Sequence, residues 1–210
     1  MQIVSAALET RNCILISSFF DAVTTRYTLG MTQTARLTEA QYLERELGAE
    51  IRHEFVDGQL FAMMSETKRH EEIVLNIVFA LRPKAKALGC RLQTKTIQLR
   101  LLNGRYRYPD VMLNCFNSDD SRIEETPCFL LEVISESSAD TDSNKKLAEY
   151  TRIPSVERYV LLEQNSRLAV VYKRQNNVWI VETLEGDGEI DIPCIGATLT
   201  LDQIYDGLEF

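Results

Sequence analysis

The chain has 210 residues, of which 45% are hydrophobic and 26% charged, so it is long and apolar enough for one globular domain with a full core. Its formal net charge of −8 argues against a protein that coats nucleic acid with its whole surface, because phosphate binding depends on local Lys and Arg side chains. A polyanionic partner would therefore have to meet a local basic region.

The cysteines are odd in number and form no CxxC pair. This pattern fits neither a zinc ribbon nor a closed disulfide framework. A reducing, cytoplasmic location is the simplest one for such a chain. The cysteines are Cys13, Cys90, Cys115, Cys128 and Cys194.

The first 30 residues read as an extension, because Met31 opens a stretch typical of a chain start. We expect residues 1–30 to be a poorly ordered N-terminal extension and residues 31–210 to form a single domain. The apolar patch from Cys13 to Phe20 is far too short to span a bilayer, and an export signal is the alternative interpretation of it. We expect no membrane association.

The first elements of the domain are predicted from local signals. Thr38 and Gln41 form a capping box, which predicts a helix that stops at Gly48. Asp57-Gly58 accepts the positive φ angles of a type I′ turn and predicts a hairpin.

Later elements follow from periodicity and further turn signals. Apolar residues recur at helical spacing after Ser65, and Pro83 should bend that helix or mark its last turns. Asn103-Gly104 and Asn176-Asn177 predict turns between strands. The elements expected in chain order are a helix at 39–47, strands at 51–56 and 59–63, a helix at 65–89, strands at 91–101, 105–115 and 129–135, a helix at 141–152, and strands at 158–163, 168–174 and 178–184. This order predicts an α/β domain around one mixed sheet.

A basic segment interrupts the acidic chain between Arg82 and Arg107, where no Asp or Glu occurs. It can be a solvated helix end and strand face, or it can hold a phosphate backbone. Its basic residues are Arg82, Lys84, Lys86, Arg91, Lys95, Arg100, Arg105 and Arg107.

Two carboxylates suggest a metal site. Asp110 follows Pro109 at the head of an apolar run, and Glu132 lies within the apolar run 129–134. A buried ionised carboxylate is costly unless it is paired or bound to a cation. A divalent ion shared with Asp110, or the ammonium of Lys146, can compensate Glu132.

Lys146 lies on the predicted helix after Glu132, with Asp142 and Tyr150 on the same face. One interpretation is an ordinary Asp142–Lys146 helix pair. The other directs Lys146 at a scissile phosphate, where a fixed cation stabilises the charge of the transition state.

These residues carry a resemblance to a known family. Four parts of the chain resemble the Uma-type family of "putative restriction endonucleases", a branch of the PD-(D/E)XK nuclease superfamily. They are Tyr108-Pro109-Asp110, the segment 131–135, the helix with Asp142, Lys146 and Tyr150, and the segment 153–160. The similarity covers about residues 37–210. It implies an α/β fold with the restriction-endonuclease-like αβββαβ core, a mixed central sheet flanked by helices, and metal-dependent phosphodiester hydrolysis.

The resemblance also implies roles for individual residues. Asp110 and Glu132 would bind Mg²⁺ or Mn²⁺ together with the Val133 carbonyl, and Lys146 would be catalytic, because Ile134 stands where the wider superfamily has lysine. The family's further motifs correspond to auxiliary residues. Apart from the resemblance, the basic segment itself offers side chains that could hold a phosphate backbone beside the site. The auxiliary residues are Glu54 and His70, and the nucleic-acid-binding residues are Lys95, Arg105 and Arg107.

Two functions remain open at this point. The first is a cytoplasmic Mg²⁺-dependent endonuclease acting on DNA, with a homodimer as one assembly that it allows. The second is a catalytically inactive interaction or regulatory module that keeps the nuclease fold. The presence of all three of Asp110, Glu132 and Lys146 favours the enzyme.

Overall fold

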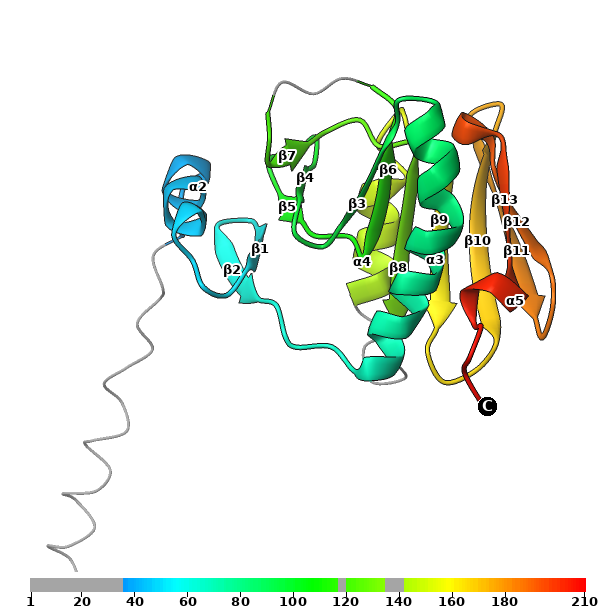
Figure 1. Ribbon diagram of the computed structural model, residues 1–210. Coiled ribbons are helices and arrows are strands. Elements are labelled where there is room, and N and C mark those ends of the chain that lie inside the picture. The colour runs from blue at the N-terminus through cyan, green and yellow to red at the C-terminus, as the bar shows by residue number, and fades with distance from the viewer. Residues whose placement is uncertain (1–35, 117–119, 135–141) are drawn as a thin grey trace, which may run out of the picture. The chain divides into compact units, whose positions relative to one another are not determined.

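The computed structural model describes residues 36–116, 120–134 and 142–210, and Leu37–Phe210 form one compact unit (Figure 1). The predicted extension at residues 1–30 lies outside the described residues, so that expectation remains a prediction. No described helix is long and apolar enough to cross a bilayer.

The domain begins with the predicted helix and hairpin. Helix α2 (Glu39–Leu47) has the capping box of Thr38 and Gln41. Strands β1 (His53–Val56) and β2 (Gln59–Ala62) are joined through Asp57 and Gly58, whose φ angles of 52° and 84° fit a type I′ turn. Both predictions are confirmed. The hairpin belongs to a five-stranded sheet of order β2-β1-β5-β4-β7, completed by β4 (Gln98–Arg100), β5 (Tyr106–Arg107) and β7 (Ile123–Glu124).

A six-stranded mixed sheet forms the centre of the fold, and in it only β8 and β9 pair in parallel. Its order is β11-β10-β9-β8-β6-β3, with bounds β3 (Arg91–Thr94), β6 (Val111–Asn114), β8 (Phe129–Ile134), β9 (Arg158–Glu163), β10 (Leu168–Gln175) and β11 (Val178–Glu185).

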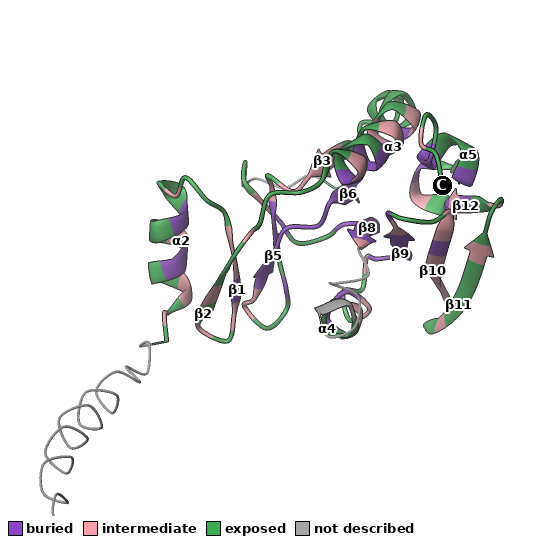
Figure 2. Ribbon diagram, turned by 90° about the horizontal axis from the view of Figure 1, so that it is seen from below, coloured by how far each residue is buried: buried purple, intermediate pink, exposed green. Residues whose placement is uncertain are grey.

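Helices cover both faces of this sheet (Figure 2). Alternate strand residues point to opposite faces, so Leu131 packs in the core cluster under α3 (Lys68–Ala87), whereas Leu130 packs in the cluster that contains Tyr150 of α4 (Asp142–Tyr150). The elements α3, β3, β6, β8, α4 and β9 form the αβββαβ core that the family resemblance implies. Strands β4, β5 and β7 lie between them in the chain but belong to the five-stranded sheet.

The C-terminal segment adds elements that the sequence analysis did not predict. They are β12 (Glu189–Ile192), the 3₁₀ helix η1 (Pro193–Ile195), β13 (Ala197–Thr200) and α5 (Leu201–Ile204). Strands β12 and β13 form a separate hairpin, and their apolar residues join the core cluster beneath α3.

Several predicted boundaries are wrong. Thr67, rather than Ser65, caps α3, whereas Pro83 lies near the end of that helix, as predicted. The single strand predicted at 91–101 is divided into β3 and β4, which belong to different sheets, because a turn at Thr94 and Thr96 separates them. The strand predicted at 105–115 is likewise divided into β5 and β6, since Pro109 cannot donate to a ladder. The single sheet expected is therefore a central sheet with two smaller ones.

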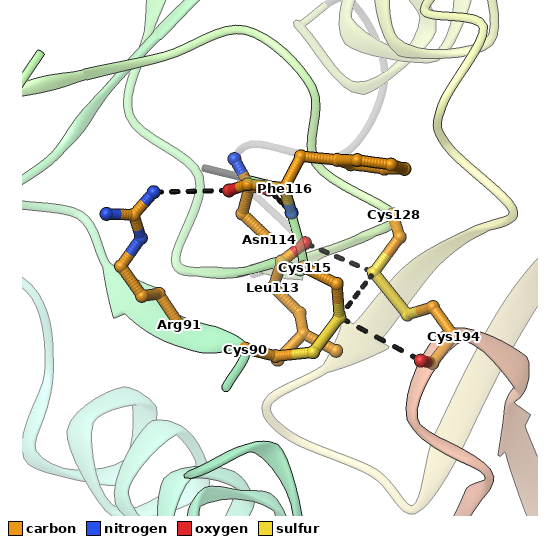
Figure 3. Close-up of a disulfide and its surroundings, with 8 residues drawn as sticks. All are labelled: Cys90, Arg91, Leu113, Asn114, Cys115, Phe116, Cys128 and Cys194. Carbon is orange, nitrogen blue, oxygen red and sulfur yellow. Dashed lines mark hydrogen bonds between the residues drawn. A yellow bond between two sulfur atoms is a disulfide. The ribbon is translucent and has the colours of Figure 1, made fainter. Parts of the chain in front are cut away.

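The expectation that the cysteines form no disulfide framework is also wrong. Cys90 is bonded to Cys115, and Cys128 to Cys194 (Figure 3). Their sequence separations of 25 and 66 residues gave no local signal, because the pairs form only when distant strand ends meet.

Candidate active site

Asp110 and Glu132 are brought together by strand register. Val111 of β6 pairs with Leu131 of β8 in an antiparallel ladder. Continuing this register by one residue sets Asp110 opposite Glu132, and directly opposite residues have Cβ atoms about 4.5–5.5 Å apart. Both side chains are buried, with 6% of each residue exposed.

Asp110 is held by three groups from different elements. Its Oδ2 accepts a hydrogen bond of 2.8 Å from the Val133 backbone N–H and lies 3.0 Å from His70 Nε2. Lys95 Nζ lies 3.6 Å from its Oδ1. Burial raises the pKa of Asp110, but the His70 hydrogen bond and charge, the Val133 N–H and Lys95 outweigh burial and hold this pKa below its usual value. Asp110 is therefore ionised and suited to bind a cation.

Glu132 has a different environment. Its Oε1 lies 3.1 Å from Lys146 Nζ and accepts a 2.9 Å hydrogen bond from the Tyr150 hydroxyl. Burial, with the charges of Asp110 and Glu54, raises the pKa of Glu132 to about 7, although Lys146 acts in the opposite direction. The ammonium of Lys146 therefore lies where it can compensate Glu132, and a shared divalent ion remains the other candidate.

Glu54 joins this group from the hairpin. Its Oε1 lies 3.4 Å from Lys146 Nζ, and its Oε2 lies 2.5 Å from Arg107 Nη1. Arg107 continues to Glu149 of α4, whose Oε2 is 2.8 Å from Arg107 Nε. A chain of alternating charges therefore ties the hairpin, β5 and α4 to Glu132.

His70 lies at the start of α3, beside a carboxylate that the sequence analysis missed. One ligand atom each from Glu66, His70 and Asp110 lie within 4.8 Å of one another. His70 Nδ1 is buried without a hydrogen-bond partner in the described chain. Glu66 also holds Lys95, at 3.0 Å from its Oε1. Glu66 lies in the segment between β2 and α3, which has no regular structure, so no periodic pattern or motif in the sequence pointed to it.

Val133 is placed consistently with the ligand role expected for its carbonyl. Its N–H faces Asp110, and the N–H and C=O of one strand residue face the same side of the strand. The oxygen donors available are thus two carboxylates and a backbone carbonyl, the type of set that suits Mg²⁺ or Mn²⁺.

Most of the expected site residues line one open cleft of about 590 Å³, whereas Lys95 and Arg105 are not among its lining residues. The lining includes Glu54, His70, Arg107, Asp110, Glu132, Val133 and Lys146. The sequence therefore identified residues that meet in space. The expected pairing of Lys146 with Asp142 involves a side chain outside the described part of the chain.

The basic segment does not form one patch beside the cleft. Arg107 is 3% exposed and paired with carboxylates, and Arg105 is paired with Asp57 and Glu149. Lys84 and Lys86 lie in the last turn of α3, about 21 Å and about 24 Å along the helix from His70. Arg105 and Arg107 are therefore paired with acidic residues distant in sequence, and their contact with phosphate stays a prediction.

Comparison with known proteins agrees with this geometry. Residues 39–202 match the family Uma2, described as "Putative restriction endonuclease". The chain is 25% identical over 179 residues to the uncharacterized protein slr1290 and 28% identical over 160 residues to the uncharacterized protein sll1609, both of Synechocystis sp. (strain ATCC 27184 / PCC 6803 / Kazusa). These alignments cover 83% and 73% of this chain and 94% and 90% of the relatives.

A solved structure shares the fold. The crystal structure of a "putative nuclease belonging to DUF820" from Anabaena variabilis ATCC 29413 superposes with a TM-score of 0.66 at 16% identity, covering 80% of this chain and 97% of that one. The α/β restriction-endonuclease-like fold predicted from the sequence is confirmed. Because the family match covers most of Leu37–Phe210, the chain belongs to the Uma2 family of restriction-endonuclease-like proteins.

Proposed function

We propose that the chain is a Mg²⁺-dependent endonuclease that hydrolyses phosphodiester bonds of DNA. The observation that supports this most directly is the convergence of Asp110, Glu132 and Lys146 at one end of β6 and β8. Membership of a nuclease-like family adds support. The buried carboxylates face an open cleft, as a site for an extended substrate requires.

Asp110, Glu132 and the Val133 carbonyl would hold the ion. When bound, Mg²⁺ supplies Lewis-acid activation of water and of the scissile phosphate. Mn²⁺ can take the same oxygen ligands.

The other side chains of the cleft orient groups and balance charge. Lys146 presents a fixed ammonium 3.1 Å from Glu132, where it can stabilise negative charge that develops on the phosphate. Tyr150 orients Glu132 through its hydroxyl, and His70 orients Asp110. Glu54 holds Lys146 in place, and Arg107 in turn holds Glu54.

DNA contact is assigned to the open side of the cleft. Lys95 lies beside Asp110, but its Nζ is buried and paired with Glu66 and Asp110, so it would have to leave these carboxylates to contact a phosphate. Arg105 is 26% exposed and can contact a backbone only at the rim, whereas buried Arg107 serves the internal charge network.

The test is cleavage of supercoiled plasmid by purified protein with Mg²⁺ or Mn²⁺. Wild type should nick or linearise the plasmid, and Asp110→Asn should abolish this because the amide weakens ion binding. Lys146→Met should reduce the rate by about 10²–10³ under saturating metal, as for loss of a preorganised charge. Matched controls are Asp202→Asn and Lys84→Met, which change exposed side chains away from the cleft.

The rival function is an inactive module with the same fold. It would be favoured if wild type binds Mg²⁺ but cleaves neither DNA nor RNA. Activity that persists in Asp110→Asn would reject the proposed site.

A further inference from the structure

Four cysteines gather at one place in the fold, although they are scattered along the sequence (Figure 3). Cys90 lies between α3 and β3, Cys115 follows β6, Cys128 precedes β8, and Cys194 lies in η1. The cluster therefore joins the α3 connection, two neighbouring strands and the C-terminal hairpin.

The two disulfides lie next to each other. Cys115 Sγ lies 4.0 Å from Cys128 Sγ, across the two disulfides. The Sγ atoms of Cys115, Cys128 and Cys194 all lie within 4.8 Å of one another, and Cys90 is the direct partner of Cys115. Zn–S bonds of about 2.3 Å place the sulfurs of a tetrahedral site about 3.8 Å apart. The sulfurs of Cys115, Cys128 and Cys194 are already close to this spacing, and the bond to Cys115 holds Cys90 beside them.

The four cysteines lie at the edge of the main core cluster, with one side packed against it and the other side partly exposed. Cys128 is 2% exposed and packs in the main core cluster, whereas Cys90, Cys115 and Cys194 are only partly buried at its edge. A reductant or an ion can therefore reach the sulfurs from one side, and the apolar core fixes the other side.

The cluster is separate from the candidate active site but shares its strands. Cys115 follows β6 and Asp110 precedes it, while Cys128 precedes β8 and Glu132 lies near its other end. At about 3.3 Å per residue, the five-residue step from Asp110 to Cys115 spans roughly 16 Å. The two groups of ligands cannot share an ion.

We propose that Cys90, Cys115, Cys128 and Cys194 form a redox-controlled tetrathiolate site for Zn²⁺. In the oxidised chain the sulfurs are paired as the two disulfides. Two molecules of a dithiol reductant convert these into four thiols, with two electrons transferred to each disulfide and each reductant closing its own disulfide. Binding of Zn²⁺ then releases four protons and gives a tetrahedral four-sulfur site.

The ligand chemistry selects the ion. Four thiolates are soft ligands and favour Zn²⁺, whereas the carboxylate and carbonyl oxygens around Asp110 favour Mg²⁺ or Mn²⁺. The site would replace two covalent links with an ion that holds the same four segments together. The ends of β6 and β8 would therefore remain fixed in both redox states.

The experiment uses the full chain, reduced with a dithiol, freed of metal and kept anaerobic. Titration with Co²⁺ should give thiolate-to-metal charge-transfer bands and tetrahedral d–d bands that saturate at one equivalent, and Zn²⁺ should displace Co²⁺ because it binds such sites more tightly. The same bands should appear in Asp110→Asn, which separates this site from the candidate active site. The oxidised chain, which has no free thiolates in the cluster, should show no thiolate-to-metal charge-transfer bands.

Single substitutions identify the ligands. Cys115→Ser and Cys194→Ser should lose the tetrahedral four-sulfur spectrum, while Cys13→Ser, which leaves all four clustered cysteines in place, should keep it. Zn²⁺ should also raise the melting temperature of the reduced Asp110→Asn chain and leave that of the oxidised Asp110→Asn chain unchanged, because this substitution removes a carboxylate ligand of the candidate active site. Absence of thiolate bands in the reduced wild type, or an unchanged spectrum in Cys115→Ser, would overturn the proposal.

Discussion

At the scale of single residues, Glu132 shows how a buried acid is maintained within an apolar strand. Its neighbours along β8 are buried and apolar, and Lys146 and Tyr150 provide its polar contacts from α4. Since α4 follows β8 in the chain, the strand carries the acid and the next helix carries its partners. This arrangement explains why a lysine on the helix can take the place of one two residues after Glu132.

The raised pKa of Glu132 predicts a pH dependence of stability. Its pKa is raised from 4.5 to about 7 in the folded apoprotein, mainly by burial. Between these values the folded chain holds a proton that the unfolded chain has released, so the free energy of unfolding should fall as pH rises through this window. Each unit of pKa difference corresponds to about 1.4 kcal/mol.

Urea unfolding with chelator present, at about pH 5 and about pH 8, measures this change. Glu132→Gln should lose less stability than wild type over the same interval, because its side chain does not titrate. Equal losses in the two proteins would assign the pH dependence to other groups.

Arg107 is predicted to contribute mainly to stability. Arg107→Met would leave the carboxylates of Glu54 and Glu149 without their shared cation, and breaking a buried pair of this kind typically costs about 3–5 kcal/mol. Arg82→Met, which changes an exposed residue of α3, should stay within about 0.5 kcal/mol of wild type.

Denaturant unfolding of both arginine variants measures the difference. If Arg107→Met kept wild-type stability and instead flattened the salt dependence of DNA binding, the residue would be a phosphate contact after all.

At the scale of elements, the β1–β2 hairpin contributes Glu54 to the site and depends on its turn. Gly58 has φ 84°, a conformation that costs other residues about 1–2 kcal/mol. Gly58→Ala should therefore destabilise the domain by about this amount.

Gly48→Ala provides the matched control for the hairpin variant. Gly48 ends α2 with φ −108°, and an added Cβ would meet nothing within 4 Å. Its melting temperature should stay near that of wild type. A similar loss in both glycine variants would show that the left-handed backbone is not the cause.

At the scale of the whole molecule, ion binding should be linked to folding. Only the folded chain brings Asp110 and Glu132 together, so Mg²⁺ should stabilise it by mass action, by about 2.7 kcal/mol at 100 times the dissociation constant. Thermal unfolding in Mg²⁺ and in chelator measures this gain. Asp110→Asn should show little or no gain, and a gain equal to that of wild type would mean that the ion binds elsewhere.

The sequence by itself determined the features that depend on near neighbours. The capping box of α2, the Asp57-Gly58 turn and the apolar run of β8 lie where their residues predicted them. Short-range signals suffice here because a cap or a turn involves residues only a few positions apart. Residue-level reasoning about buried charge and the family resemblance both pointed to Asp110, Glu132 and Lys146, which do meet in one cleft.

Only the tertiary structure decided which distant residues become partners. Arg107 looks available for phosphate in the sequence, but its partners Glu54 and Glu149 lie 53 and 42 residues away. Cys128 and Cys194, 66 residues apart, have no recognisable spacing, yet strand order brings their sulfurs together. Burial and long-range pairing depend on which distant strands and helices become neighbours, and no local pattern of residues specifies that choice.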